Sequence, residues 1–508
     1  MHLPKAITLR RASQVFFLLL FVGLFLSARF PLQKTVPPDL LLRLDPLAGV
    51  TAGMAARTLI ASFWPALLVL LLAFLLGRSF CGWVCPLGAC LDGWNRLLPH
   101  GKTRRGDHRW KYAILIGVLL LSFLSLQAAW LLDPLVIFTR TLTLVFYPLA
   151  AWGLGSLLEA GFAWTWIESP ALFATDLFRG WFLPLAPFQT ALLTVTLGMF
   201  LGLLLLDRFG RRYWCRNLCP LGAGLGLISR FSPFGRRVDG HSCTECSLCA
   251  EDCRMGAIED DYERTRRGEC ILCLECAQTC PANGTTFAWG KPKARQEALD
   301  LGRRRLLGTL GAAVALGGVW RASLPDVKAA GGRIRPPGAV EEDRFLDLCL
   351  RCQQCVKACS STGGCLQPAE LESGWESAWT PVARMREGYC EYACTLCGEV
   401  CPSGAVKPLT EAAKKQKVIG LAWIDRSRCI PWVKGEDCIV CEEHCPVPDK
   451  AIIFRPGQVV LPDGLRDNVK IPYVDTTLCI GCGICETRCP IPGDAAIHVT
   501  SEGEQREI

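Results

Sequence analysis

The chain has 508 residues, 51% of them hydrophobic, and it carries 30 cysteines. A chain of this length can build its own hydrophobic cores, so cysteines in such number are more typical of metal or iron–sulfur ligation than of disulfide stapling. The charge is divided: residues 1–332 hold 35 Lys and Arg against 22 Asp and Glu, whereas residues 333–508 hold 20 against 25. The basic residues of the first part lie beside apolar runs, which favours a membrane protein and gives no indication of a nucleic-acid partner.

Four apolar segments approach the ~20 residues that span about 30 Å of hydrocarbon; they lie at about 14–30, 59–77, 112–131 and 188–206. Basic clusters flank these segments and predict their orientation, because Lys and Arg gather on the cytoplasmic side. The clusters are Lys5–Arg11, Gly101–Lys111 and Asp207–Arg212. We therefore expect a multi-pass protein of the bacterial cytoplasmic (inner) membrane, in contact with lipid, whose N-terminus lies in the cytoplasm.

The stretch 136–187 is apolar and rich in Trp and Phe. The predicted orientation allows zero or two crossings within it. Interfacial or re-entrant helices are the favoured interpretation, because aromatic side chains gather at the depth of the membrane interface. Two further spans are the alternative.

The membrane part contains an internal repeat. The motif C-x3-C-P-L-G-A begins at Cys81 and again at Cys215, and in each copy an arginine lies three residues before the first cysteine. Upstream, the motif Leu-Asp-Pro-Leu contains Asp45 in one copy and Asp133 in the other. We interpret this as a duplicated two-helix unit with both cysteine motifs on the cytoplasmic side and both aspartates facing outward, as in parallel repeats.

The sequence leaves open the role of these repeated residues. Duplication would bring four thiols together, namely Cys81, Cys85, Cys215 and Cys219. We predict that they form one shared redox or metal site, because thiolates suit iron–sulfur and other soft metal centres; the alternative is a pair of Cys-Pro turns that dock the next domain. Asp45 and Asp133 each precede a proline, which is a good helix start, and the alternative to this capping role is proton handling for a quinol.

Two cysteine runs with C-x2-C-x2-C-x3-C spacing come after the last predicted span. This is the spacing of bacterial two-cluster ferredoxins, in which the fourth cysteine of each run serves the other cluster. The spacing therefore predicts one 4Fe–4S cluster held by Cys243, Cys246, Cys249 and Cys280, and another held by Cys270, Cys273, Cys276 and Cys253. Structural zinc is the alternative, but zinc sites usually separate two cysteine pairs by a longer loop.

Residues Gly302–Trp320 combine three arginines, Arg303, Arg304 and Arg305, with a short apolar run rich in Ala and Gly. This pattern is typical of a twin-arginine export signal, here inside the chain. The alternative is a basic cap on an ordinary helix. The cysteine-rich region downstream favours export, because a domain whose clusters are assembled in the cytoplasm has to cross the membrane folded.

Four more cysteine groups lie beyond this segment. Three of the four end in Cys-Pro, and the two middle groups have stretched spacings. Sixteen cysteines would hold four 4Fe–4S clusters; disulfides are the alternative, but they would not require four runs of one pattern. The groups are Cys349, Cys352, Cys355, Cys359; Cys390, Cys394, Cys397, Cys401; Cys429, Cys438, Cys441, Cys445; and Cys479, Cys482, Cys485, Cys489.

Other redox cofactors leave no signature. No C-x-x-C-H motif is present, and all six histidines lie outside the predicted spans, so neither c-type haem nor a bis-histidine haem in the bilayer is expected. The glycines of Gly222–Gly226 come after a Cys-Pro turn instead of a strand, so they are not an NAD site. We also find no flavin motif.

On these motifs, residues 1–290 resemble the membrane ferredoxin-type subunit of periplasmic nitrate reductase systems (NapH-like), and residues 300–508 resemble its exported partner (NapG-like). The methylamine-utilisation ferredoxins and the membrane part of the nitrous-oxide reductase regulator NosR are similar. This chain departs from the pattern in being a fusion, in having Cys359 followed by Ser, and in lacking an outer flavin domain.

The resemblance to four-cluster ferredoxins also implies a pairing of outer with outer and inner with inner groups. In that pairing Cys489 would complete the first group and Cys359 the last. Likewise Cys445 would join the second group and Cys401 the third. Two cysteines fall outside every group and are expected to be plain buried thiols, namely Cys90 and Cys365.

The predicted fold is an α-helical membrane bundle with a duplicated two-helix unit, joined to α+β bacterial-type ferredoxin domains. The expected divisions are a membrane domain (1–235), a cytoplasmic two-cluster ferredoxin (236–295), an internal signal or fifth span with a linker (296–334), and a periplasmic four-cluster ferredoxin (335–508). The predicted function is electron transfer through six 4Fe–4S clusters between the quinol pool and a periplasmic redox partner, as a possible quinol dehydrogenase component. The alternative is an electron donor for the maturation or regulation of a periplasmic metalloenzyme.

Overall fold

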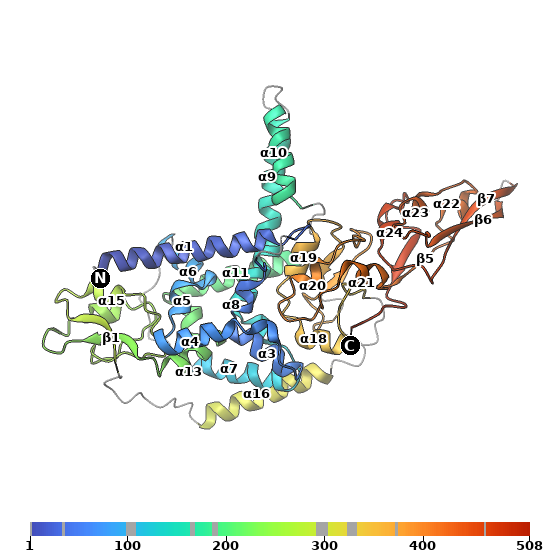
Figure 1. The fold of residues 1–508 in the computed structure, drawn as a ribbon. Helices are drawn as coiled ribbons and strands as arrows, with labels where there is room; N and C mark the ends of the chain where they lie inside the picture. The colour runs from blue at the N-terminus through green and yellow to red at the C-terminus, as the bar shows by residue number, and fades with distance from the viewer. Residues whose placement is uncertain are drawn as a thin grey trace.

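The computed structural model describes residues 3–32, 36–97, 108–162, 168–184, 192–290, 303–322, 333–370, 374–461 and 464–507. A helical bundle lies between two small cysteine-rich domains, which occupy its opposite ends (Figure 1). We call these domains the first ferredoxin (residues 236–290) and the second ferredoxin (residues 335–507), and the ends of the bundle that carry them the first end and the second end.

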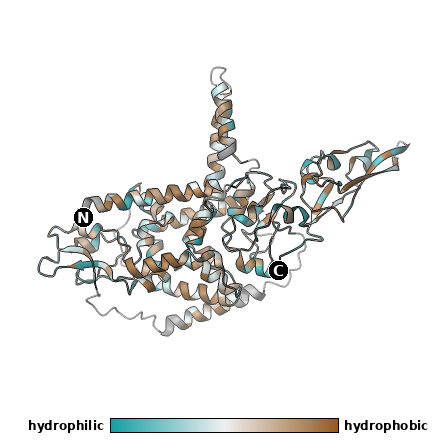
Figure 2. Cartoon of the chain, in the orientation of Figure 1, coloured by the Kyte–Doolittle hydropathy of each residue, from teal (hydrophilic) through white to brown (hydrophobic). Residues whose placement is uncertain are grey.

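Long apolar helices run between the two ends of the bundle (Figure 2). Among the described residues, three stretches are long and apolar enough to cross a membrane: Ala6–Ser27, Pro134–Gly161 and Leu192–Phe209. Two of these coincide with predicted spans, whereas the predicted spans at 59–77 and 112–131 form shorter helices, of 11 and 15 residues. The helices along the bundle are α1 (Leu3–Ser27), α4 (Ala66–Leu76), α7 (Arg109–Phe123), α11 (Leu192–Leu205) and α16 (Arg303–Ala322).

Four short helices begin with the same pattern, an Asp or Cys followed by Pro-Leu. Proline suits the first helical position because its missing N–H would be unpaired there anyway. The four are α3 (Pro46–Ala55), α6 (Pro86–Leu97), α8 (Pro134–Thr141) and α13 (Pro220–Ser229). Shorter pieces connect the bundle helices: α2 (Leu40–Arg43), η1 (Ala61–Phe63), α5 (Ser79–Trp83), η2 (Ala129–Leu131), η4 (Leu206–Phe209) and α12 (Tyr213–Asn217).

The contacts of these four helices give their directions. The C-terminal side of α3 packs at Ala56 and Ile60 on the second ferredoxin, and Arg140 near the end of α8 stacks there on Trp379. In contrast, α6 and α13 reach the first ferredoxin, through Asp92 and Gly226 respectively. Because α3 packs against α13 and α6 against α8, all four helix N-termini point toward the interior of the bundle.

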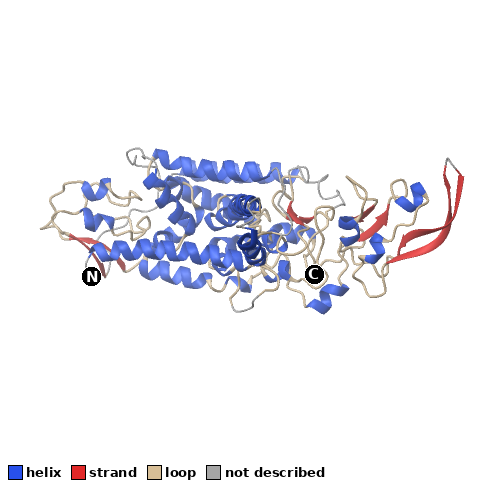
Figure 3. Cartoon of the chain, turned by 90° about the horizontal axis from the view of Figure 1, so that it is seen from above, coloured by secondary structure: helices blue, strands red, loops and turns tan. Residues whose placement is uncertain are grey.

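The stretch 136–187 leaves the bundle sideways. A π-helical turn η3 (Leu142–Phe146) continues α8 into α9 (Tyr147–Gly161), which forms an antiparallel hairpin with α10 (Glu168–Trp181). This hairpin projects across the direction of α1 and α11, and it is seen end-on when the molecule is viewed from above (Figures 1 and 3). Its exposed side chains include Trp152 and Phe173.

The first ferredoxin is built on one antiparallel pair of strands, β1 (Phe234–Val238) and β2 (Thr285–Trp289). The register pairs Phe234 with Trp289 and Val238 with Thr285. Between the strands lie two short helices, one after each cysteine loop: α14 (Leu248–Glu251) and α15 (Glu275–Thr279).

The second ferredoxin has three separate two-stranded sheets, and the long β6–β7 hairpin extends away from the bundle (Figure 1). The pairs are β3 (Leu366–Pro368) with β4 (Pro381–Ala383), β5 (Leu421–Ile424) with β8 (Ile497–Thr500), and β6 (Ile452–Leu461) with β7 (Gly464–Val474). Its helices are α18 (Glu342–Leu348), α19 (Gln354–Cys359), α20 (Leu396–Glu399), α21 (Glu411–Gln416), α22 (Ile430–Lys434), α23 (Val440–Glu443) and α24 (Ile484–Arg488).

One hydrophobic core connects the bundle with both ferredoxins. It includes Ile271 of the first ferredoxin, the cysteines of the repeat, and Leu350 and Trp379 of the second ferredoxin. Helix α16 packs along α7 and runs from the first end to the second (Figure 1). The chain thus passes from one ferredoxin to the other along the outside of the bundle.

Candidate metal centres

The eight cysteines of the first ferredoxin form two sets of four. Cys253 lies with Cys270, Cys273 and Cys276 around a cavity with an empty volume of about 360 Å³. Cys249 has Cys243, Cys246 and Cys280 as its thiol neighbours. In each set the fourth cysteine comes from the other run, which is the exchange that the spacing predicts. We call them the Cys270 set and the Cys243 set.

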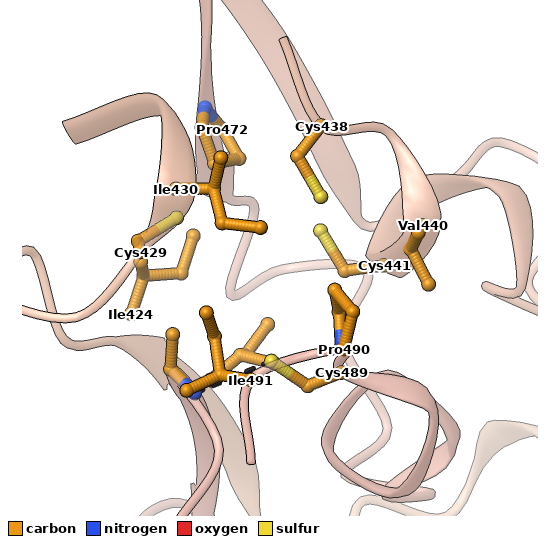
Figure 4. A pocket seen from close by; sticks show the side chains of 12 residues that line it. Ile424, Cys429, Ile430, Cys438, Val440, Cys441, Pro472, Cys489, Pro490 and Ile491 are labelled. Carbon is orange, nitrogen blue, oxygen red and sulfur yellow. Dashed lines mark hydrogen bonds between the residues drawn. The ribbon is translucent and has the colours of Figure 1, made fainter. Parts of the chain in front are cut away.

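The second ferredoxin corrects the pairing implied by the four-cluster resemblance. Consecutive runs exchange their fourth cysteines: Cys401 lies beside Cys355, and Cys489 lines a cavity with Cys429 and Cys441 (Figure 4). The physical reason is local, because α19 packs on α20 and α23 packs on α24, so each pair of runs closes its own two-set unit. The sets are Cys349, Cys352, Cys355, Cys401; Cys359, Cys390, Cys394, Cys397; Cys429, Cys438, Cys441, Cys489; and Cys445, Cys479, Cys482, Cys485.

The lining of these cavities fits iron–sulfur clusters in its chemistry. Three of the four sets of the second ferredoxin line spaces with empty volumes of about 350 to 420 Å³, and the other lining residues are mostly apolar. Backbone amides donate to the fourth thiols, at 3.3 Å to Cys253, 3.5 Å to Cys401 and 3.3 Å to Cys489. Such donors to cluster sulfurs are part of iron–sulfur ligation. In the described part of the chain no three His, Cys, Asp or Glu side chains are placed to hold a single metal ion.

Burial makes these thiols unfavourable as isolated thiolates. It raises the pKa of Cys482 to about 12 and that of Cys485 well above the usual thiol value. A metal cluster supplies the positive charge that ionised ligands in such a site require, and metal binding releases their protons. Four buried thiols around a mostly apolar cavity are therefore a site suited to a cluster.

Cys365 is not the isolated buried thiol that the sequence suggests. It lies in the cavity of the set formed by Cys359, Cys390, Cys394 and Cys397, which we call the Cys390 set. The Cys365 Sγ lies 3.9 Å from Cys359 Sγ. A hydrogen bond from Cys365 outweighs the effect of burial, which would raise the pKa, and lowers the pKa of Cys390 to about 6. The Cys390 set thus has a fifth thiol in contact with two of its members. Cys90 is half-buried at the edge of the bundle core.

Cys81, Cys85, Cys215 and Cys219 form a compact group, which we call the cysteine quartet. All four are buried, and Cys219 has the other three thiols as neighbours. The arginine before each pair reaches across the repeat: Arg212 donates to the Cys81 carbonyl at 2.8 Å, and a Cβ on Gly222 would lie 2.5 Å from the Arg78 guanidinium. Each half of the repeat thus packs on the arginine of the other half.

The cysteine quartet lies directly against the first ferredoxin. A Cβ on Gly82 would lie 2.2 Å from the Ile271 carbonyl oxygen, so only glycine fits at this contact. Trp83 donates to the Leu272 carbonyl at 3.1 Å. Ile271 and Leu272 separate Cys270 from Cys273, so the loop of the Cys270 set rests on the quartet motif.

Ion pairs fasten the first ferredoxin to this end of the bundle. Glu269 accepts from Arg78 at 3.0 Å and also from Lys111, while Asp92 accepts from both Arg212 and Arg254. Burial acts to raise the pKa of Glu269, but Lys111 and Arg78 prevail and lower it to about 2. The carboxylate therefore remains ionised and paired throughout the physiological pH range.

Asp45 and Asp133 cap α3 and α8, as the Asp-Pro motif predicts. One carboxyl oxygen of Asp45 accepts from the Leu47 and Ala48 amides, and one of Asp133 accepts from Leu135 and Val136 in the same way. Both aspartates are fully buried, and their remaining oxygens have no other donor among the described residues. The two carboxyl groups are close enough to influence each other's charge, although their remaining oxygens form no hydrogen bond with each other.

The second ferredoxin is held at the second end by a different kind of contact. Lys357 donates to two carbonyl oxygens at the end of α1, at 2.9 Å to Leu26 and 2.8 Å to Ala28. Arg351 donates to the Gln127 carbonyl, and Trp379 donates to the Thr196 hydroxyl at 3.2 Å. These side chains of the second ferredoxin donate to carbonyl and hydroxyl oxygens of the bundle, which carry no full charge.

Sequence reasoning missed the charged residues at both contacts. It noted the arginines before the cysteines only as part of the repeat, and Arg140 not at all. The available signal was a charged side chain beside or within an apolar run, because such residues are rarely left without a function. Nothing in the sequence pointed to the partners Glu269 and Asp92, because the roles of these carboxylates depend on which surfaces pack together.

Two family models described as "4Fe-4S binding domain" match the chain, one at residues 58–105 and again at 190–238, the other at 472–491. The protein YccM of Escherichia coli strain K12 is 30% identical over 274 residues, 51% of this chain and 68% of that protein. The ferredoxin-type protein NapG of the same strain is 34% identical over 194 residues, covering 36% of this chain and 78% of NapG. The methylamine utilization ferredoxin-type protein MauM of Methylorubrum extorquens is 36% identical over 41% of this chain and 90% of MauM. No solved structure matches.

Proposed function

The chain belongs to the NapG/NapH-like family of ferredoxin-type proteins with a membrane part, and from this we propose that it carries electrons through iron–sulfur clusters across a membrane, between the quinol pool and a periplasmic redox partner. The observation that carries the proposal is the placement of two multi-cysteine ferredoxins at opposite ends of one apolar bundle. Quinol oxidation that supplies a reductase is the favoured direction, by analogy with the nitrate systems.

Six 4Fe–4S clusters are assigned to the six cysteine sets, two in the first ferredoxin and four in the second. When bound, each would accept or donate one electron without bond rearrangement in the protein. The residues of the chain hold the clusters in dry cavities and donate amide hydrogen bonds to their sulfurs, which set their potentials together with net charge and exposure.

The cysteine quartet is proposed as a further redox or metal site between the first ferredoxin and the bundle interior. Four buried thiols close together form a soft ligand set, and the two arginines packed on their loops are already paired with Glu269 and Asp92. The two matches of one family model, at 58–105 and 190–238, support the duplication that creates this set. The quartet would be the innermost station on the route from the first ferredoxin.

Asp45 and Asp133 are the proposed proton-handling residues of the quinol reaction. Their capping role accounts for one oxygen of each, and the facing pair of remaining oxygens supports a shared proton, because two buried carboxylates this close cannot both be ionised. The pair lies where the N-termini of α3 and α8 point into the bundle, and the positive ends of these helices favour negative charge there.

Metal analysis and a quinone assay test the proposal. Anaerobically purified protein should contain about 24 iron atoms per chain for the six ferredoxin clusters alone, and a quinone analogue should reoxidise the reduced clusters in membranes. Replacing any quartet cysteine by Ser, for example Cys215→Ser, should abolish the quinone response while the ferredoxin clusters stay intact. The matched control is Cys90→Ser, which should retain the response. Half the expected iron, or full activity in every quartet variant, contradicts the assignment.

A normal quinone response in a strain whose periplasmic metalloenzyme is inactive and lacks metal would instead favour a maturation or regulatory role.

A further inference from the structure

A cluster of tryptophans and arginines lies where the bundle meets the second ferredoxin. The bundle contributes Trp130 and Arg140, and the ferredoxin contributes Arg351, Trp375 and Trp379. The Trp130 ring centroid lies 5.5 Å from that of Trp379 and 6.3 Å from that of Trp375. The Arg140 guanidinium lies against both of these rings, 5.2 Å from the centroid of Trp130 and 5.2 Å from that of Trp379.

Arg140 is a buried cation without a carboxylate partner in the described structure. The residue is 1% exposed, and its Nε and one terminal nitrogen have no acceptor among the described residues. Arg351 is a charged group that repels it, and Cys352 would attract it once ionised as a metal ligand. Burying a charge is costly unless it is paired, and contact with two aromatic rings offsets only part of that cost.

Cys352 belongs to the set formed by Cys349, Cys352, Cys355 and Cys401, which lies at this contact. Leu350 and Arg351 lie between Cys349 and Cys352 in the chain, and Arg351 lies over the Trp130 ring, with its Cζ 4.3 Å from the centroid. Two guanidinium groups, one from each domain, therefore lie beside the thiols of one set. A cluster held by four thiolates carries net negative charge, and reduction adds one more.

We propose that Arg140 is a positioning residue that compensates the charge of the cluster held by Cys349, Cys352, Cys355 and Cys401. The bundle itself thereby raises the reduction potential of the cluster that touches it. This inference rests on the proposed cluster assignment. The uptake of one electron by the cluster is stabilised by the cation, whose effect is large because water is excluded from the contact. The tryptophan rings keep the guanidinium dry and in place.

Redox titration of the full-length protein, followed by electron paramagnetic resonance, tests the inference. In Arg140→Gln the signal of one cluster should shift to lower potential while the signals of the other clusters stay in place, and Arg140→Lys should shift it less because the charge is retained. The matched control is Arg236→Gln in the first ferredoxin, whose guanidinium donates to Cys249 Sγ at 3.4 Å. It should shift a different signal and leave the Arg140-sensitive one unchanged.

The outcomes separate this inference from the proposed function. An unshifted set of potentials in Arg140→Gln at full iron content overturns the role of Arg140 but leaves the cluster assignment intact. If the reduction potentials are unshifted and the response to a quinone analogue is weakened, charge compensation by Arg140 is also overturned. The unpaired N–H groups of Arg140 are then assigned to a quinone oxygen. Iron analysis of Cys352→Ser checks the premise, since loss of about four iron atoms confirms a cluster in this set and unchanged iron contradicts the proposed function itself.

Discussion

The two ends of the bundle hold their ferredoxins by opposite chemistry. At the first end buried and half-buried cations face carboxylates: Arg78 and Lys111 share Glu269, and Arg212 and Arg254 share Asp92. At the second end the buried cations face aromatic rings, neutral carbonyl oxygens and thiols. The charges at the first contact are paired without any cofactor, whereas the second contact leaves positive charge that a cluster anion can compensate.

This difference indicates how each domain becomes attached. A contact closed by ion pairs can form as soon as both surfaces have folded. A contact with uncompensated cations is most stable when the neighbouring cysteine set is loaded, because the cluster supplies the missing negative charge. Docking of the second ferredoxin would then depend on its clusters, which suits a domain that crosses the membrane folded.

The largest effect is expected from removing the second contact altogether. Replacing Arg303 and Arg304 together by Lys should leave residues 335–508 in the cytoplasm, because export machinery reads the arginine pair whereas a span needs only flanking positive charge. Protease added to spheroplasts should then spare the second ferredoxin. Digestion as in the parent protein would show that α16 is an ordinary anchor.

Breaking the first contact should be nearly as severe. Glu269→Gln leaves Lys111 and Arg78 buried without a carboxylate, and such a loss typically costs about 3 to 5 kcal/mol. Limited proteolysis should then release the first ferredoxin at a lower denaturant concentration. The control is Glu259→Gln, which removes a partly exposed ion pair with Arg266 and should cost at most about 1 kcal/mol. Equal effects of the two variants would contradict the buried network.

A moderate effect is expected at the second contact. Lys357→Met keeps most of the apolar stem but removes two hydrogen bonds to the last carbonyls of α1, each charge-assisted bond being worth about 1.5 to 3 kcal/mol. The second ferredoxin should exchange its interface amides with deuterium faster, while its iron content is unchanged. Lys407→Met, at a lysine outside this contact, should leave the exchange unchanged.

The smallest effect concerns the fifth thiol. Cys365→Ala removes a hydrogen-bonding partner of Cys359 and Cys390, and fewer hydrogen bonds to cluster sulfurs lower the reduction potential. One signal should move to lower potential, by less than in Arg140→Gln, whereas Cys365→Ser should shift it less than Cys365→Ala. A loss of about four iron atoms in Cys365→Ala would instead make Cys365 a ligand.

Local sequence patterns were enough to predict the cysteine runs of the ferredoxins, two helix caps and two of the long helices. Cysteine spacing predicted the ferredoxin domains and the exchange of fourth cysteines in the first ferredoxin, because three ligands of a cluster come from one tight loop. The Asp-Pro motif predicted the caps of α3 and α8, because capping depends on residues two and three positions away. Apolar length predicted α1 and α11, though two other predicted spans fold as shorter helices.

How these parts meet depends on packing between segments that are far apart in the chain. The pairing of cysteine sets in the second ferredoxin depends on which loops pack together, so α19 with α20 and α23 with α24 overruled the pairing drawn from resemblance. The position of Cys365 beside Cys359, the sideways α9–α10 hairpin and the stacking of Arg140 on Trp379 also depend on long-range packing. No local pattern encodes such contacts, because each joins residues whose separation in sequence says nothing about their separation in space.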